Sequence, residues 1–225
     1  MKREIEKTIA GIKVTAEPGI DIDIATTAKP FTDWLETLDR DNFDIRALHF
    51  NSVTMFSPTR AGFLKWTTDV VDRQGRWLPG IIFARGGAVT VICVLICEAK
   101  SYAVVTVQPR LATGDFHFVE LCAGMLDGSG HFAGTAAKEL KEELHIEVDA
   151  ADLVDMSELA GHDRGVFLSP GACEETMRFF AYCRRISRSE LEAMNGRCTG
   201  LAEEGEQITL KIVELDEVLS LADAK

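Results

Sequence analysis

The chain has 225 residues, of which 46% are hydrophobic, and a formal net charge of −12. This length and composition predict a globular protein with one large domain, or one domain and a smaller appendage. The acidic charge argues against nucleic acid as the main partner, because the phosphate backbone is bound by clustered Lys and Arg. It is compatible with a small phosphorylated ligand, since a bound metal reverses the local sign of the charge.

No apolar run reaches the roughly 20 residues that a membrane-spanning helix needs, and we expect no membrane partner. Residues 1–7 carry charge with no apolar segment behind them, so no secretory signal is expected. The expected location is cytoplasmic, with an organellar targeting signal left open. The six cysteines lack CxxC spacing, which favours buried, reduced thiols over a zinc site or disulfides.

In chain order, the pattern predicts strands and short helices that together form a mixed sheet. Strands are predicted at 7–17, 44–56, 61–72, 76–83, 88–97, 102–108, 116–121, 153–158, 176–183 and 207–213. Helices are predicted at 31–38, at 190–194, at 216–221 and after Thr135, which is a candidate N-cap. Few helices and many strands indicate an α+β fold or an α/β/α sandwich, not a doubly wound sheet.

The predicted helix after Thr135 carries Glu139, Glu142 and Glu143 within about one turn. Like charges at i+3 and i+4 repel by a few tenths of a kcal/mol per pair. Such a cluster suggests a hard divalent cation, which takes oxygen ligands. A lone acidic helix is more often a solvated face. Gly124, fourteen residues before Lys138, follows an apolar strand and favours a site instead.

Gly124 and the run Lys138-Glu139-Leu140-Lys141-Glu142-Glu143 resemble the Nudix box. In that box a glycine, an early glutamate and an Arg-Glu-apolar-x-Glu-Glu-x-Gly motif follow one another at fixed spacing. Three positions depart from the pattern: Gly130 replaces the early glutamate, Lys138 the arginine and His145 the last glycine. A glycine at that last position often ends a helix in the left-handed conformation, which histidine also tolerates.

The resemblance implies a Nudix fold with a mixed central sheet and a divalent-metal site for Mg²⁺ or Mn²⁺. It implies that Glu139 and Glu143 bind the metal and that Glu142 supports or also ligates it. The backbone carbonyl of Ala123 is expected to complete the site. Glu142 and Glu143 are also candidates for the catalytic role.

A wider resemblance is to the nucleoside-diphosphate-sugar diphosphatases, close to the plant ADP-sugar type. It is carried by the segments 62–65, 79–86, 120–127 and 169–175. By this resemblance residues 1–86 form a β-rich segment that helps dimerisation and roofs the nucleotide site, and residues 87–225 form the Nudix domain. The expected partners are a nucleotide sugar and a second copy of the chain.

Pro170-Gly171 predicts a turn in a loop that continues into Glu174 and Glu175. In ADP-ribose and ADP-sugar hydrolases a loop glutamate acts as general base or as an added metal ligand. The resemblance assigns that role to Glu174 or Glu175, and the sequence does not choose between them. The alternative is two solvated loop acids.

Arg85 and Arg110 are candidate clamps for the diphosphate, because guanidinium groups pair bidentately with phosphate oxygens. Each lies at the end of an apolar strand, and the alternative for each is a surface salt bridge. Glu120 is a candidate substrate-side residue behind the ligands. Glu206 is interpreted as a solvated acid. Trp66 and Trp77 are candidate base-stacking residues, although a Trp in an apolar run more often belongs to the core.

The predicted reaction is hydrolysis of the phosphoanhydride of a nucleoside diphosphate sugar to a nucleoside monophosphate and a sugar 1-phosphate. One alternative is a diphosphatase for another substrate, such as ADP-ribose or a dinucleotide. Another is a Nudix-like binding or regulatory module, which the three departures from the box favour. A third, an acidic helix with a structural role only, predicts no effect of divalent ions on the melting temperature.

Overall fold

A computed structural model describes residues 6–126, 131–201 and 206–224. The chain forms two compact units. The N-terminal unit comprises Met1–Gly87 and Phe167–Glu175, and the C-terminal unit comprises Ala88–Val166 and Thr176–Lys225. The first junction falls beside the boundary expected after residue 86. The segment 167–175, expected in the second part of the chain, has its contacts in the N-terminal unit.

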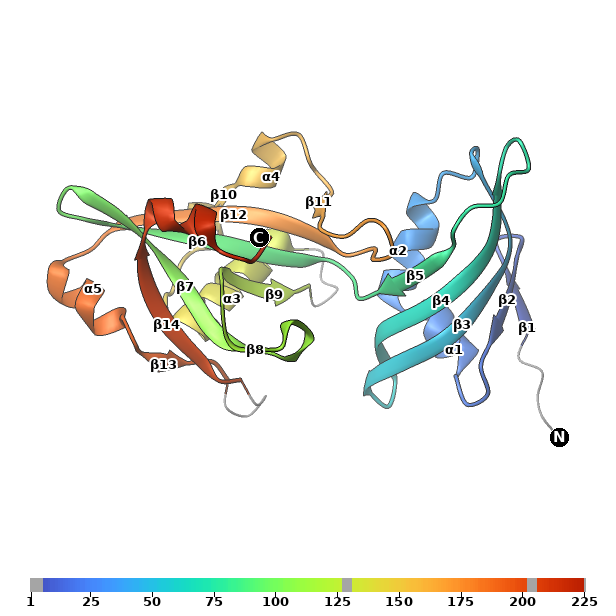
Figure 1. The fold of residues 1–225 in the computed structure, drawn as a ribbon, viewed down its shortest axis with the longest axis horizontal. Helices are drawn as coiled ribbons and strands as arrows, with labels where there is room; N and C mark the ends of the chain where they lie inside the picture. The colour runs from blue at the N-terminus through green and yellow to red at the C-terminus, as the bar shows by residue number, and fades with distance from the viewer. Residues whose placement is uncertain (1–5, 127–130, 202–205, 225) are drawn as a thin grey trace. The chain divides into compact units, whose positions relative to one another are not determined.

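The N-terminal unit contains a five-stranded sheet (Figure 1). Its strands are, in spatial order, β1 (Glu6–Ile9), β2 (Ile12–Ala16), β3 (Phe43–Ser57), β4 (Arg60–Asp72) and β5 (Ile81–Ala84). The single strand expected at 7–17 is instead a hairpin, because Ala10 and Gly11 turn the chain with φ of 49° and 86°. The long antiparallel pair β3 and β4 agrees with the prediction.

Two helices, α1 (Ile22–Thr27) and α2 (Lys29–Thr37), pack on this sheet and close its core. Trp66 is fully buried there, with its ring centroid 5.6 Å from Phe31 and 5.8 Å from Phe50. Trp66 is therefore a core residue, and the idea that it stacks a base is wrong. Trp77 is 68% exposed. The helix α1 was not expected from the sequence, and it begins after Asp21, whose carboxylate caps two backbone N–H groups.

The C-terminal unit contains a nine-stranded mixed sheet. Its main path runs β10 (Val154–Asp155), β12 (Thr176–Arg185), β6 (Ala88–Cys97), β7 (Lys100–Arg110), β14 (Ile208–Glu214) and β13 (Cys198–Thr199). Three further strands pair with this path: β8 (Asp115–Glu120), β9 (Cys122–Met125) and β11 (Val166–Phe167). The β12–β6 pair is parallel, and the β6–β7 and β7–β14 pairs are antiparallel.

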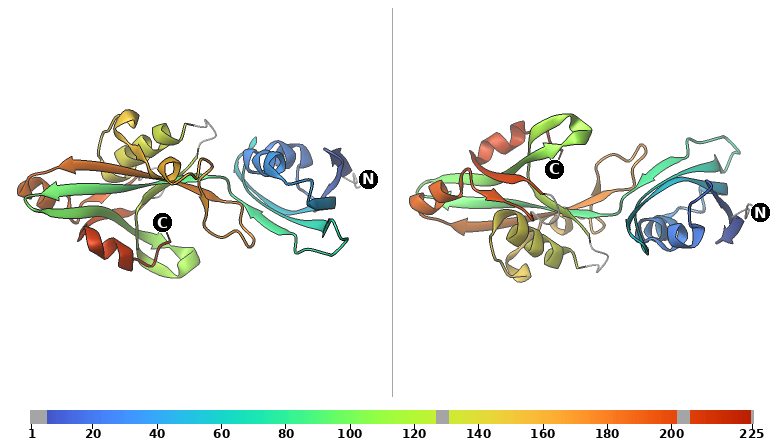
Figure 2. Two further views of the ribbon diagram at one scale, coloured as in Figure 1. Left: turned by 90° about the horizontal axis from the view of Figure 1, so that it is seen from above. Right: turned by 90° about the horizontal axis from the view of Figure 1, so that it is seen from below.

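Helical segments cover both faces of this sheet, which makes the unit the expected α/β/α sandwich (Figure 2). On one face α3 (Phe132–Leu144) and α5 (Arg188–Met194) pack on β6, where Leu140 and Leu191 join the main core cluster. On the other face η4 (Leu215–Ser220) covers Ala103 and Val105 of β7. The strand expected at 153–158 is correct only at β10, because the chain continues as the short helix α4 (Met156–Leu159). No helix in the described ranges is long and apolar enough to cross a membrane.

All six cysteines are free thiols, as expected. Cys93, Cys97 and Cys122 are buried, but Cys183 and Cys198 are exposed, so the expectation of burial holds only for part of the set.

Candidate active site on helix α3

Helix α3 begins earlier and ends where the sequence indicated. Its N-cap is His131, so Thr135 is a buried residue of the first turns and not the cap. At the other end His145 is left-handed, with φ of 55°, and its backbone N–H donates to the carbonyl of Leu140. The left-handed helix end predicted at His145 is therefore confirmed. Gly130, the departure in the preceding loop, lies outside the described residues.

Gly124 on β9 faces the carboxylate of Glu139 on α3. A Cβ atom at position 124 would lie 1.8 Å from Oε1 of Glu139, far inside any real contact. The sheet strand and the helix can approach this closely only because residue 124 has no side chain. The glycine of the box thus makes room for the first glutamate of the helix.

Glu143, one helical turn further on, is buried and held from β9. Its side chain is only 4% exposed, and the backbone N–H of Ala123 donates to its Oε2 at 3.2 Å. The thiol of Cys122 forms a second hydrogen bond to the same carboxylate. Two neighbouring residues of β9 therefore orient this buried acid.

Burial raises the pKa of both acids. The pKa of Glu139 rises to about 7, first because of burial and then because of the charges of Glu143 and Glu142. Burial also raises the pKa of Glu143 to about 7, against the hydrogen bonds from Cys122 and Ala123. Burial makes the ionised form of each carboxylate unfavourable, and a cation bound to both would stabilise the ionised forms.

Glu142 lies beside this pair but has a cationic partner. Its Oε2 is 3.3 Å from Nζ of Lys138, the residue that stands where the box has arginine. The contact is an i,i+4 pair on the exposed side of the helix, a type worth a few tenths of a kcal/mol. Such a pair is weak enough to open when a stronger cation binds. The catalytic or ligand role of Glu142 stays a prediction.

Arg110 and Glu120 form an ion pair with each other. Glu120 is 2% exposed, and Nε of Arg110 donates to its Oε1 at 2.6 Å. The charge of Glu120 contributes to the raised pKa of Glu143. Arg110 as a diphosphate clamp and Glu120 as a substrate-side residue stay predictions, and a clamp at Arg110 would act with Nε and one terminal nitrogen already engaged by Glu120.

Glu206 is an acid to which the sequence assigned no role in the site. It is half-buried, its Oε2 accepts from the backbone N–H of Leu201 at 2.9 Å, and its charge raises the pKa of Glu139 and Glu143. Glu206, expected to be a solvated acid, is thus only partly exposed and accepts a backbone hydrogen bond. Nothing in its sequence neighbourhood separates it from the exposed acids of the chain, because its position depends on tertiary packing.

The donor set fits a magnesium ion. Within the described ranges no group of three or more His, Cys, Asp or Glu side chains forms a ready ligand set, in keeping with the pairing of Glu142 to Lys138. Magnesium, however, is usually held by one or two carboxylates, with water and substrate phosphates completing its shell. Glu139 and Glu143 supply two such carboxylates, and both carry the desolvation cost that a cation relieves.

The remaining predicted residues lie together in the N-terminal unit, around the segment 167–175. The backbone N–H of Gly86 donates to Oε1 of Glu174 at 2.7 Å, and Nε of Arg85 is 3.4 Å from Oε1 of Glu175. Burial raises the pKa of Glu174 to about 7. The two candidate loop acids are thus engaged with Arg85 and its neighbour, and their catalytic role stays a prediction.

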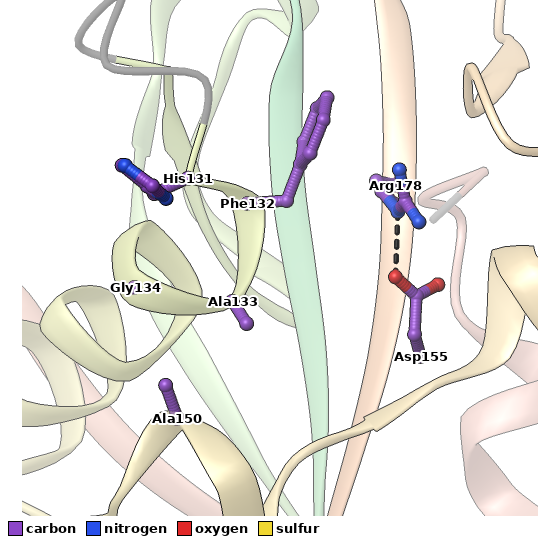
Figure 3. Close-up of a pocket in the computed structure, with 7 residues that line it drawn as sticks. All are labelled: His131, Phe132, Ala133, Gly134, Ala150, Asp155 and Arg178. Carbon is purple, nitrogen blue, oxygen red and sulfur yellow. Dashed lines mark hydrogen bonds and ion pairs between the residues drawn. The ribbon is translucent and has the colours of Figure 1, made fainter.

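A hollow of about 460 Å³ lies at the first turn of α3 (Figure 3). Arg178 lines it, but its Nε donates to Asp155 at 2.6 Å and its guanidinium lies 4.6 Å from the ring centroid of Phe132. The hollow is lined by His131, Phe132, Ala133, Gly134, Ala150, Asp155 and Arg178. None of these is a predicted site residue.

The box glycine, the buried glutamates and the sandwich define a protein class, and comparisons with known proteins agree. The NUDIX domain family matches residues 87–225. The chain belongs to the Nudix hydrolase family.

Two known proteins place the chain within that family. It is 36% identical over 229 residues to "Nudix hydrolase 14, chloroplastic" of Arabidopsis thaliana, covering 95% of this chain and 74% of the relative. The fold is similar to that of a solved ADP compounds hydrolase, with a TM-score of 0.53 and 13% identity over 80% of this chain and 84% of that one.

Replacing Gly124 by alanine should damage the site without unfolding the protein. The new methyl group would displace the carboxylate of Glu139, which is the movable end of a flexible side chain. We expect Mg²⁺ affinity and turnover to fall by about 10- to 100-fold, a range typical of misplaced metal ligands, with little change in melting temperature. Titration calorimetry and steady-state rates measure both.

Gly134→Ala is the matched control, since a Cβ there would meet its nearest neighbour at an ordinary 3.6 Å. Alanine is also the better helix former at that position. An unchanged Mg²⁺ affinity in Gly124→Ala would contradict the assigned role of the glycine.

Proposed function

We propose that this protein hydrolyses the diphosphate bond of a nucleoside diphosphate sugar in a reaction that depends on a divalent metal. The products are a nucleoside monophosphate and a sugar 1-phosphate. The observation that carries the proposal is the pair of acids on α3, half-buried Glu139 and buried Glu143, held against Gly124 and Ala123 in a Nudix box. The ADP compounds named for the structural neighbour favour an adenine nucleotide.

In this proposal Glu139 and Glu143 hold the Mg²⁺ or Mn²⁺ ion, with Glu142 and the carbonyl of Ala123 as further ligands. When bound, such an ion neutralises the diphosphate and makes a bound water more acidic. The chain itself mainly positions the substrate and accepts a proton, as in other phosphoryl transfers. Cys122 and the amide of Ala123 keep Glu143 oriented while the substrate binds.

The proposed base, which accepts the proton of the attacking water, is a glutamate of the box or of the 169–175 loop. Glu142 and Glu143 are the candidates from the box. Glu174 or Glu175 as the base stays a prediction.

Arg85 and Arg110 are the proposed ligands of the diphosphate. A guanidinium group offers two parallel N–H donors to phosphate oxygens. Arg85 is about one-third exposed and lies just after β5, and Arg110, two-fifths exposed, lies at the end of β7. Exposed guanidinium groups at strand ends can receive a ligand without unfolding any element.

A homodimer formed through the N-terminal unit is also proposed. Large apolar side chains of its sheet are exposed, among them Phe56 at 46% and Phe83 at 40%. Phe63 lies between these two, with ring centroids 5.0 Å from Phe56 and 5.8 Å from Phe83. A contiguous exposed aromatic row favours association. Light scattering that gives the mass of a monomer at micromolar concentration would contradict the dimer.

A substrate panel tests the function. Purified protein with Mg²⁺ is given ADP-glucose, UDP-glucose, ADP-ribose and a dinucleotide, and the products are identified by chromatography. We expect fastest turnover on an ADP-sugar, with AMP as one product. Tight binding of ADP-glucose with no hydrolysis of any of the four would favour the binding-module alternative instead.

A further inference from the structure

We propose that Glu174 and Glu175 are positioning residues that hold Arg85 in place to bind the diphosphate of the substrate. This inference rests on the proposed function, since it takes Arg85 as a diphosphate ligand. It gives the two acids of the Ser169-Pro170-Gly171 loop a structural task instead of a proton-transfer task.

The loop is attached to the sheet edge that carries Arg85. The backbone N–H of Phe83 donates to the carbonyl of Ala172 at 2.7 Å, and the N–H of Glu174 donates back to the carbonyl of Phe83 at 3.3 Å. Phe83 and Cys173 form a parallel bridge. The loop thus extends the N-terminal sheet beyond β5, and this extension ends beside Arg85.

Glu174 binds the backbone of Arg85 and of Gly86, the residue that follows it. Its Oε1 accepts from the N–H of Gly86 at 2.7 Å, and the backbone N–H of Arg85 is a second donor to the same carboxylate. Gly86 has a φ of 85°, a left-handed conformation that turns the chain out of the strand. Glu174 therefore stabilises the turn that sets the direction of the Arg85 side chain.

Glu175 holds the guanidinium itself. Its Oε1 lies 3.4 Å from Nε of Arg85, and the guanidinium carbon lies 5.7 Å from the ring centroid of Phe63. The carboxylate of Glu175 and the ring of Phe63 together limit the movement of the Arg85 side chain. Nε of Arg85 is buried and has no hydrogen-bond partner among the described residues, so its contact with Glu175 is an ion pair and not a hydrogen bond. In the proposal the planar guanidinium turns its donors to phosphate oxygens.

The contacts of Glu174 favour a positioning role over the role of general base. A base must reach the attacking water within hydrogen-bond distance. One oxygen of Glu174 is bonded to Gly86, and the other, Oε2, is buried from solvent without a hydrogen-bond partner in the described residues. A carboxylate that is shielded from solvent and accepts hydrogen bonds from backbone N–H groups stabilises the conformation of that backbone.

The difference between glutamine and alanine at position 174 separates the two roles. Glutamine keeps an oxygen that accepts from Gly86, whereas alanine does not. Positioning predicts that Glu174→Gln keeps KM and kcat for ADP-glucose within about threefold. It predicts that Glu174→Ala raises KM about tenfold, the size expected for one lost hydrogen bond to a charged group. Arg85→Ala should raise KM at least as much.

The experiment measures kcat, KM and the pH–rate profile for Glu174→Ala, Glu174→Gln, Arg85→Ala and the double variant Arg85→Ala/Glu174→Ala. Hydrogen exchange of the peptide that contains Gly86 is recorded for the same proteins. Because Glu174 acts through Arg85, the double variant should have the KM of Arg85→Ala alone. Exchange at Gly86 should accelerate in Glu174→Ala and stay slow in Glu174→Gln. Glu36→Ala, an exposed acid on α2, is the control.

A loss of kcat by about 1000-fold in Glu174→Gln, with a changed acidic limb of the pH–rate profile, would overturn the positioning role and make Glu174 the base. Additive effects of Glu174→Ala and Arg85→Ala on KM would also overturn it. Absence of hydrolysis by the unsubstituted protein would instead overturn the proposed function. Hydrogen exchange distinguishes failure of the positioning role from failure of the proposed function. It reports the hydrogen bond from the N–H of Gly86 to Glu174 whether or not substrate is hydrolysed.

Discussion

Replacing Glu143 by glutamine should lower Mg²⁺-dependent hydrolysis of an ADP-sugar by about 1000-fold while the protein stays folded. Glutamine has the same shape and can still accept from the N–H of Ala123, so the packing on β9 is kept. The charge that holds the metal is lost, and about 4 kcal/mol of transition-state stabilisation corresponds to this fall in rate. Steady-state rates and circular dichroism measure the two effects.

Glu147→Gln is the matched control for that substitution. Glu147 lies just beyond the same helix, is 77% exposed and pairs with Lys141 at 2.8 Å. Rates and melting temperature should not change, because exposed ion pairs contribute little. Near-normal turnover in Glu143→Gln would show that the buried acid is not part of the catalytic machinery.

The second large effect is a loss of stability with rising pH in the metal-free protein. The folded pKa values of Glu139 and Glu143 are about 7, above the ordinary 4.5 of an unfolded chain. Stability linked to these groups is therefore complete below about pH 4.5 and is lost as pH rises through about 7. For one fully buried carboxyl the shift corresponds to about 3 kcal/mol, and to less for the half-buried Glu139.

Melting temperatures between pH 5.5 and 8.5, with EDTA or with Mg²⁺, measure this linkage. In EDTA the melting temperature should fall across the range, and Mg²⁺ should restore it at pH 8.5 but hardly change it at pH 5.5, because the ligands must lose protons to bind. The pKa of Glu174, in the N-terminal unit, is also raised to about 7. Mg²⁺ should not restore the part of the stability loss that comes from ionisation of Glu174.

The double variant Glu139→Gln/Glu143→Gln should show no Mg²⁺ effect at either pH. An equal Mg²⁺ effect at pH 5.5 and 8.5 in the unsubstituted protein would contradict the assignment of the raised pKa values to the metal ligands.

Most of the fold could be predicted because its strands are long and apolar. The strand predicted at 88–97 has those bounds in β6, and β3, β4 and β12 are close to their predicted ranges. Short elements were missed for a physical reason. The six residues of α1 are too few for a clear periodicity, and α4 follows β10 without any break in composition.

The cluster of carboxylates on α3 could be predicted because it depends on spacing within one loop and one helix. Gly124, Glu139 and Glu143 have their geometry set by β9 and α3, which are neighbours in the sequence. Glu206 and Cys122 could not be predicted as parts of the site. Their contribution depends on burial and on contacts with Glu143, which only the tertiary structure determines.

The contacts of the loop acids were also beyond the sequence. Glu174 accepts from Gly86, 88 positions earlier in the chain. The sequence contains the two acids and the turn before them, but it does not indicate which sheet edge the loop contacts. For this reason the sequence suggested a catalytic task, whereas the contacts suggest a positioning task.

The most direct test of metal-dependent diphosphate hydrolysis is phosphorus NMR of ADP-glucose mixed with the unsubstituted protein. With Mg²⁺ the diphosphate signals should disappear and the signals of AMP and glucose 1-phosphate should grow together. Added EDTA should stop the reaction. No products with Mg²⁺ or Mn²⁺, or products that form equally fast in EDTA, would contradict the proposed function.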